Sequence, residues 1–148
     1  MTDLEKIRNW IYTYPGINAA LDLQVDYYSN APENSSIAPS GLQELSRKED
    51  ILGNVIVENQ YNFALYFVFP KTPGDDISAT KNAEWLLNFQ CWAQEQSIRR
   101  LVPTFGDEPK KETIKAQNGE IVDADPDGIG VYMVLLSINF IKQYEVKK

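Results

Sequence analysis

The sequence predicts an α+β domain, in which a single antiparallel or mixed sheet of about four to six strands carries one long and one short helix on one face. Three observations predict this fold. Segments 61–69 and 129–141 are rich in aromatic and β-branched residues, which favour strands. Segments 3–14 and 77–98 repeat apolar residues at helical spacing. The long helix separates two groups of strands, an order typical of helices gathered on one side of a sheet.

Length, composition and charge limit the class of protein. The chain has 148 residues, so we expect 1–148 to fold as a single domain. A hydrophobic content of 43% is enough for a core. The net charge of −7 argues against nucleic-acid and anionic-membrane partners, because both need clustered Lys and Arg. The start of the chain lacks a signal-peptide pattern, and no apolar run reaches the ~18 residues of a membrane helix. We therefore expect a protein that stays in the cytoplasm or in a particle assembled there.

The first helix begins at a capping box. Thr2 offers a hydroxyl at the cap and Glu5 a carboxylate three residues later, while Pro15-Gly16 ends the helix. Alternating apolar and polar residues then predict a half-buried strand at 21–28. The Pro, Ser, Asn and Gly content of 29–41 predicts a long loop.

The middle of the chain predicts three strand segments. Residues 42–50 are polar and indicate an exposed strand, and 51–59 are β-branched with a kink or bulge at Gly53-Asn54. The clearest strand is 61–70, which Pro70 ends.

The second half begins with the long helix and ends with the most apolar strand. Asn118-Gly119 is the strongest two-residue hairpin signal, so we expect a turn between strands at 111–117 and 120–124. The closing strand covers about 129–145.

The strands at 61–69 and 129–141 are apolar on both faces, so we expect them to pair at the centre of the sheet. The helices cover one face, and a large apolar patch rarely stays exposed on a monomer. Two explanations remain open for the second face: cover by the long loops or the first helix, or cover by a neighbouring subunit. In the second case the acidic loops and segment 29–50 would meet other partners. The candidate self-association surface then consists of Tyr66, Val68, Val131, Met133 and Leu135.

Nothing in the residue pattern supports an enzyme. The chain has no histidine, which removes the commonest general base and transition-metal ligand. Its one cysteine, Cys91, is expected to be a small buried side chain of the long helix. Asp123, Asp125 and Asp127 match the opening of a calcium loop, but the bidentate acid would fall at Val134. We interpret these aspartates as turn residues and expect neither a metal nor a cofactor.

Several segments resemble a family of small proteins encoded in the tail modules of tailed bacteriophages and prophages of Gram-positive bacteria. The resemblance covers most of the chain in order. It consists of a short N-terminal helix ending in Pro, followed by "LDLQVDYYS", "SSIAPSG", "YNFALYFVFP", "NAEWLLNFQCWAQEQ" and "IVDADPDGIGVYMVLLSINFIK".

The same element order is similar to that of tail terminator, or tail completion, proteins of long-tailed phages. This resemblance implies a structural virion protein that forms a homo-oligomeric ring, such as a hexamer, and docks to tail-tube and head-connector proteins. It also implies a place in the virion tail, with assembly in the host cytoplasm. Another tail-module role, such as a minor capsid, minor tail or head–tail joining protein, fits nearly as well. The alternative from another class is a small-molecule binding module or transferase with an aromatic pocket, for which Trp10, Trp85 and Trp92 are the candidates.

Overall fold

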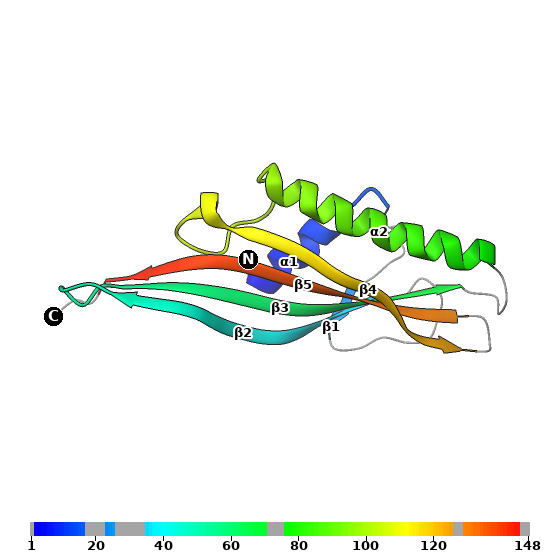
Figure 1. The fold of residues 1–148 in the computed structure, drawn as a ribbon, viewed down its shortest axis with the longest axis horizontal. Coiled ribbons are helices and arrows are strands. Elements are labelled where there is room, and N and C mark those ends of the chain that lie inside the picture. The colour runs from blue at the N-terminus through cyan, green and yellow to red at the C-terminus, as the bar shows by residue number, and fades with distance from the viewer. Residues whose placement is uncertain (1, 17–22, 26–34, 71–75, 126–128, 146–148) are drawn as a thin grey trace.

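The fold is that of a computed structural model, which describes residues 2–16, 23–25, 35–70, 76–125 and 129–145 (Figure 1). Side chains are described at these positions except 23–25, 70, 76–79, 118–125 and 129. The elements in chain order are α1 (Asp3–Ile11), β1 (Leu23–Val25), β2 (Ser35–Glu49), β3 (Val55–Pro70), α2 (Asp76–Ile98), the 3₁₀ helix η1 (Pro109–Lys111), β4 (Thr113–Asp125) and β5 (Ile129–Tyr144).

The strands form one five-stranded sheet in the order β1-β2-β3-β5-β4. The short β1 pairs with β2 in parallel, and the other neighbours are antiparallel. Strands β3 and β5 pair without a register shift from Val55↔Tyr144 to Pro70↔Ile129. The predicted α+β class is therefore confirmed, as is the pairing of the two most apolar strands inside the sheet.

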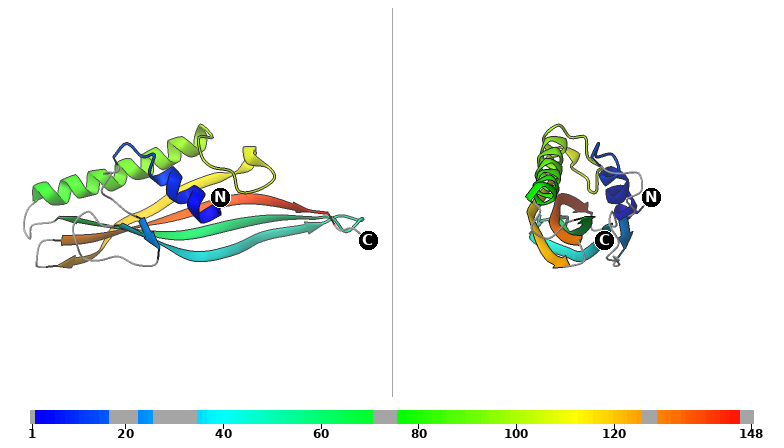
Figure 2. Two further views of the ribbon diagram at one scale, coloured as in Figure 1. Left: turned by 180° about the vertical axis from the view of Figure 1, so that it is seen from behind. Right: turned by 90° about the vertical axis from the view of Figure 1, so that its right-hand side faces the viewer.

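Both helices pack on the same face of the sheet (Figure 2). Alternate residues of β3 and β5 point to this face, because side chains alternate along a strand. The core contains Phe63, Leu65 and Phe67 of β3, Val134, Leu136 and Ile138 of β5, Ile7, Trp10 and Ile11 of α1, and Leu86, Phe89 and Ala93 of α2. Its burial is the main favourable term that holds the helices on the sheet.

Helix α1 begins as predicted. The amide of Glu5 donates to Thr2 Oγ1 over 3.2 Å, and the amide of Thr2 donates to Glu5 Oε2 over 3.4 Å, which completes the capping box. The helix ends at Ile11, three residues before the predicted end. Tyr14 follows in a turn, where its ring lies buried against α2.

Helix α2 is held on the sheet by aromatic packing. Trp10 of α1 stacks on Trp92 with ring centroids 4.7 Å apart. Trp85 contacts Phe67 of β3 edge-to-face over the same distance, and its Nε1 donates to the carbonyl of Gly16 over 2.9 Å. The tryptophans therefore join the two helices to the core.

The prediction of a hairpin turn at Asn118-Gly119 is wrong. Strand β4 runs through this pair, and both of its halves pair with β5, from Thr113↔Asn139 to Asp125↔Ile129. A register shift between Gln117 and Glu120 accommodates one extra residue on β4, as a β-bulge does. The stabilisation that β4 gains by pairing along the whole of β5 exceeds the local preference of Asn-Gly for a turn.

Two further boundaries differ from the expectation. The kink expected at Gly53-Asn54 is a chain reversal, and β3 begins only at Val55. The loop expected at 29–41 is in its described part a strand, since β2 starts at Ser35 and continues through the polar segment 42–49. The first half of that expected loop, and most of the strand expected at 21–28, lie outside the described residues.

Candidate interaction surface

One end of the sheet extends beyond both helices (Figures 1 and 2). We call this end the arm. It consists of Gly41–Glu49 of β2, the turn 50–54, Val55–Gln60 of β3 and Asn139–Tyr144 of β5. Every residue from Pro39 to Leu52 is exposed, so the β2 side of this hairpin and its turn have little cover, whereas Val57 and Asn59 on the β3 side are buried.

The turn at the tip of the arm is held by Asp50. Its Oδ1 accepts hydrogen bonds from the amides of Leu52 and Asn54, each over 2.9 Å, and its Oδ2 accepts one from the side-chain amide of Asn54. Gly53 takes a φ of 85°, a left-handed conformation that favours glycine. These contacts fix the tip in one shape.

Large exposed apolar side chains concentrate on the arm. Six of the ten found among the described residues lie there: Leu42, Leu45, Ile51, Leu52, Ile56 and Tyr144. Ile51 has a relative exposure of 103% and Leu52 of 73%, so the tip is apolar and bare. Single exposed apolar residues are common, but such a concentration makes this end of the sheet a candidate interaction surface. Sequence reasoning missed this surface, although Ile51-Leu52 between polar neighbours was a signal for it.

The outer edge of β2 resists addition of a further strand. Strand β1 pairs only with Ser35–Ile37, and beyond Ile37 no described strand lies on that edge. Two register shifts interrupt this part of β2, and Arg47 forms an ion pair of 2.6 Å with Glu44. Bulges, charges and the nearby Pro39 are features that protect an edge from strand pairing. We therefore expect the arm to make contacts through its side chains.

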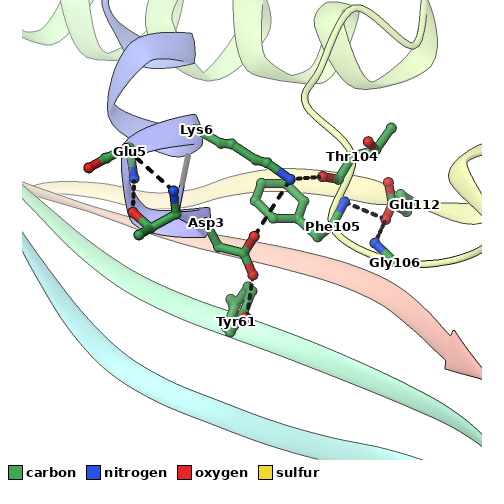
Figure 3. A network of polar contacts seen from close by, with 9 residues as sticks. Asp3, Glu5, Lys6, Tyr61, Thr104, Phe105, Gly106 and Glu112 are labelled. Carbon is green, nitrogen blue, oxygen red and sulfur yellow. Dashed lines mark hydrogen bonds and ion pairs between the residues drawn. The ribbon is translucent and has the colours of Figure 1, made fainter. Parts of the chain in front are cut away.

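The opposite edge of the arm is covered by the segment 105–108. The amide of Asp107 donates to the carbonyl of Ile141 over 2.7 Å, and Asp107 Oδ2 accepts from the amide of Gln143 over 2.7 Å. Gly106 lies so close that a Cβ there would sit 2.2 Å from the oxygen of Ile141. Buried Glu112 holds the segment, because its Oε1 accepts from the amides of Phe105 and Gly106 (Figure 3).

A second polar network fixes α1 at the base of the arm (Figure 3). The hydroxyl of Tyr61 donates to Asp3 Oδ2 over 2.6 Å, and Lys6 Nζ donates to the carbonyl of Thr104 over 2.9 Å. Burial, followed by the hydrogen bond to Asp3, raises the pKa of Tyr61 to about 12. The neutral phenol is thus the form that the fold stabilises.

A groove separates α2 from the edge strand β4. It has a volume of about 530 Å³ and is lined by Leu87, Gln90, Cys91, Gln94, Ser97 and Ile98 of α2 and by residues 113–117 of β4. Cys91 is exposed in this groove, so its predicted burial is wrong. The reason is that Cys91 lies on the side of α2 turned away from Phe89 and Ala93, which face the core.

The face predicted for self-association is partly closed within one chain. Val68 and Val131 pair across β3 and β5, are 0% and 1% exposed, and pack against Tyr66. Because Val68 and Val131 are already buried, they cannot contact a second copy of the chain in this conformation. Tyr66, Met133 and Leu135 of the same face are partly buried. The structure brings the five residues together, but their part in self-association stays a prediction.

The other candidate chemistry has little support in the geometry. Trp10, Trp85 and Trp92 pack in or against the core, and the groove between α2 and β4 has no aromatic residue in its lining. The side chains of Asp123, Asp125 and Asp127 lie outside those that the structure describes. Among the remaining acidic and cysteine side chains, no group of three is placed to hold a metal ion.

Comparison with protein-family models and with curated proteins finds no match for this chain. The fold and its surfaces are therefore the basis for a function. Within the described residues, neither helix is both long and apolar enough to cross a membrane.

Proposed function

We propose that this protein is a structural assembly protein that acts by self-association and by docking to other structural proteins. The observation that carries this proposal is the arm, a hairpin extending past the helices with Ile51 and Leu52 bare at its tip. The outer part of this hairpin, from Pro39 to Leu52, is exposed throughout and adds little to the core of its own chain. Its apolar side chains stabilise the protein's contacts only when a second surface buries them.

The size of the arm favours several weak contacts over one tight one. Full burial of an aliphatic side chain is worth about 1.5–3 kcal/mol. Association costs about 4–15 kcal/mol in lost translational and rotational freedom. Ile51 and Leu52 alone therefore give at most a weak contact. Such contacts are suited to closed assemblies, in which each copy is held by two neighbours.

The particular assembly that we propose is a phage or prophage tail. This step rests on the resemblance of the sequence to tail-module proteins, above all to tail terminator or completion proteins. In that role the protein forms a ring, such as a hexamer, in the virion tail and docks to tail-tube and head-connector proteins. It is assembled in the host cytoplasm, and no bond is made or broken.

Light scattering on a sizing column, followed by electron microscopy, tests this proposal. We expect the molar mass to rise with concentration and ring-shaped particles to appear. In a phage or prophage that carries the gene, its deletion should leave tails that are not joined to heads. A protein that stays monomeric, together with normal joined particles after the deletion, would overturn the proposal.

The alternative, a small-molecule binding module or transferase, is favoured only by the groove between α2 and β4. Its volume of about 530 Å³ is in the range of ligand pockets. The lining contains Lys115 as its single charged side chain. A strictly monomeric protein whose Cys91 is protected from thiol reagents by a small ligand would favour this alternative.

A further inference from the structure

We infer that the tip of the arm of one copy docks into the groove between α2 and β4 of the next copy. This inference rests on the proposed self-association and names the two surfaces that make it. The first surface is the tip, residues 48–52. The second is the groove, lined by Leu87, Cys91, Gln94 and Ile98 of α2 and by residues 113–117 of β4.

The groove is built to take side chains. Strand β4 is the last strand of the sheet, and an open edge would ordinarily invite a further strand. Here α2 occupies that edge at two points: the amide of Ile114 donates to Ser97 Oγ over 3.0 Å, and Gln90 Nε2 donates to the carbonyl of Ala116 over 3.2 Å. Strand addition would break both bonds. An apolar side chain can enter between exposed Leu87 and Ile98 without breaking either.

The tip presents two apolar side chains on a preformed turn. Ile51 and Leu52 are consecutive residues of a reversal, so they project from the end of a two-stranded support. The three hydrogen bonds to Asp50 hold the reversal before any contact forms. Docking therefore orders little additional chain, which lowers its entropic cost.

The charges around the two surfaces are complementary. Glu49, Asp50 and Glu145 surround the tip, with Lys48 as the single described cation among them. Five cations lie at or beside the end of the groove where α2 finishes: Arg99, Arg100, Lys110, Lys111 and Lys115. Two of them pair with Glu95 and Glu108. Glu95, Asp107, Glu108 and Glu112 lie in the same region, so its excess of positive charge is small, but it is opposite in sign to the excess of acidic residues at the tip.

The contact joins two different surfaces, so it is heterologous. The tip lies at one end of the molecule and the groove lies along α2 and β4, away from that end (Figure 1). Each copy that docks its tip still offers a free groove, and the next copy can add in the same way. Such contacts give a ring if the rotation closes and a filament if it does not.

Cysteine cross-linking tests the inference directly, because Cys91 is the one cysteine of the chain and is exposed in the groove. An Ile51→Cys variant places a second thiol at the tip. Oxidation, or treatment with a short bismaleimide, should then give a ladder of covalent dimers, trimers and larger species. Salt weakens the attraction between oppositely charged surfaces. The yield of the ladder should therefore be several-fold lower at high salt than at low salt.

Three controls identify the linkage. Wild-type protein, with Cys91 alone, should stop at dimers or remain monomeric. The Ile51→Cys/Cys91→Ser variant should also lose the ladder, since a chain of links needs both thiols. Lys81→Cys adds an exposed thiol to α2, about 15 Å from Cys91 along the helix axis and toward the start of the helix. This variant should give no ladder.

The outcomes separate this inference from the proposed function. A ladder that needs both thiols supports the inference. If the wild type self-associates but the ladder is absent, or if only tip-to-tip dimers form and persist in the Cys91→Ser background, the inference is overturned and the proposed self-association stands. If there is neither self-association nor a ladder at any concentration, both are overturned.

Discussion

Tyr61 joins the base of the arm to α1 through the hydrogen bond that its hydroxyl donates to Asp3. Its pKa rises from the usual value near 10 to about 12, with burial as the larger cause and the Asp3 bond as the smaller. The neutral phenol is favoured in the folded chain. This contribution to stability is complete below pH 10 and is lost as the pH rises from about 10 through 12.

Replacing Tyr61 by Phe removes the hydroxyl and keeps the ring. We expect the free energy of unfolding at neutral pH to fall by about 1 kcal/mol, the usual worth of one hydrogen bond. Between about pH 10 and 12 the variant should lose less stability than the wild type, because it lacks the ionisable group. Urea unfolding at pH 7 and pH 11 measures both effects. An unchanged difference between wild type and variant at the two pH values would contradict this account.

Glu112 is a buried carboxylate with a structural task. Its Oε1 accepts hydrogen bonds from the amides of Phe105 and Gly106, whereas Oε2 has no partner among the described residues. Glu112→Ala leaves both amides unpaired, and the amide of Phe105 lies in a buried position. We expect a loss of about 2 kcal/mol in the free energy of unfolding, with a smaller loss in Glu112→Gln, which keeps an acceptor. Faster amide exchange at Phe105 and Gly106 should accompany this loss of stability. A Glu112→Ala variant as stable as the wild type would refute the structural role of Glu112.

At the residue scale, sequence reasoning succeeded where the relevant contacts are local. The capping box of Thr2 and Glu5 joins residues three positions apart, and it was predicted correctly. The exposure of Cys91 was also signalled by the sequence, but the signal was missed. Cys91 is two residues from Phe89 on a helix of about 3.6 residues per turn, so it lies opposite the side on which Leu86, Phe89 and Ala93 pack in the core.

The arm is the element that distinguishes this fold, and Asp50 shapes its end. Asp50→Ala removes three hydrogen bonds in an exposed turn, so we expect only about 1 kcal/mol of global destabilisation. The larger effect should be local: the amides of Leu52 and Asn54 should exchange faster, and self-association should weaken because the tip is less ordered. Amide exchange and sizing chromatography measure the two effects. Asp50→Asn, which keeps one acceptor, is the matched control and should be intermediate.

At the element scale, local turn signals were the least reliable guide. Asn118-Gly119 and Gly53-Asn54 both carry turn residues, and the sequence predicted the reversal at the first pair. The structure reverses at the second and bulges at the first. The difference lies in the pairing: β5 is long enough to hold both halves of β4, and the gain from this continuous ladder exceeds the local preference of two residues.

At the scale of the whole molecule, the two most apolar strands were identified from composition and do pair inside the sheet. Their second face was the reason to expect a subunit interface. In the single chain this face already buries Val68 and Val131, so that reason is weaker than the sequence alone suggested. The arm supplies a different reason. Its extension past the helices depends on the register of β2, β3 and β5, which no local pattern reveals.

We propose that the bare apolar tip of the arm drives self-association. Sedimentation of the wild type, of Ile51→Ser/Leu52→Ser and of Tyr12→Ser tests it most directly. Tyr12 is also an exposed apolar residue but lies at the end of α1, away from the arm, so Tyr12→Ser is the control. We predict that the wild type and the control associate as the protein concentration rises. The tip variant should keep its fold, but its association should need protein concentrations at least tenfold higher. Equal association of all three proteins would contradict the account.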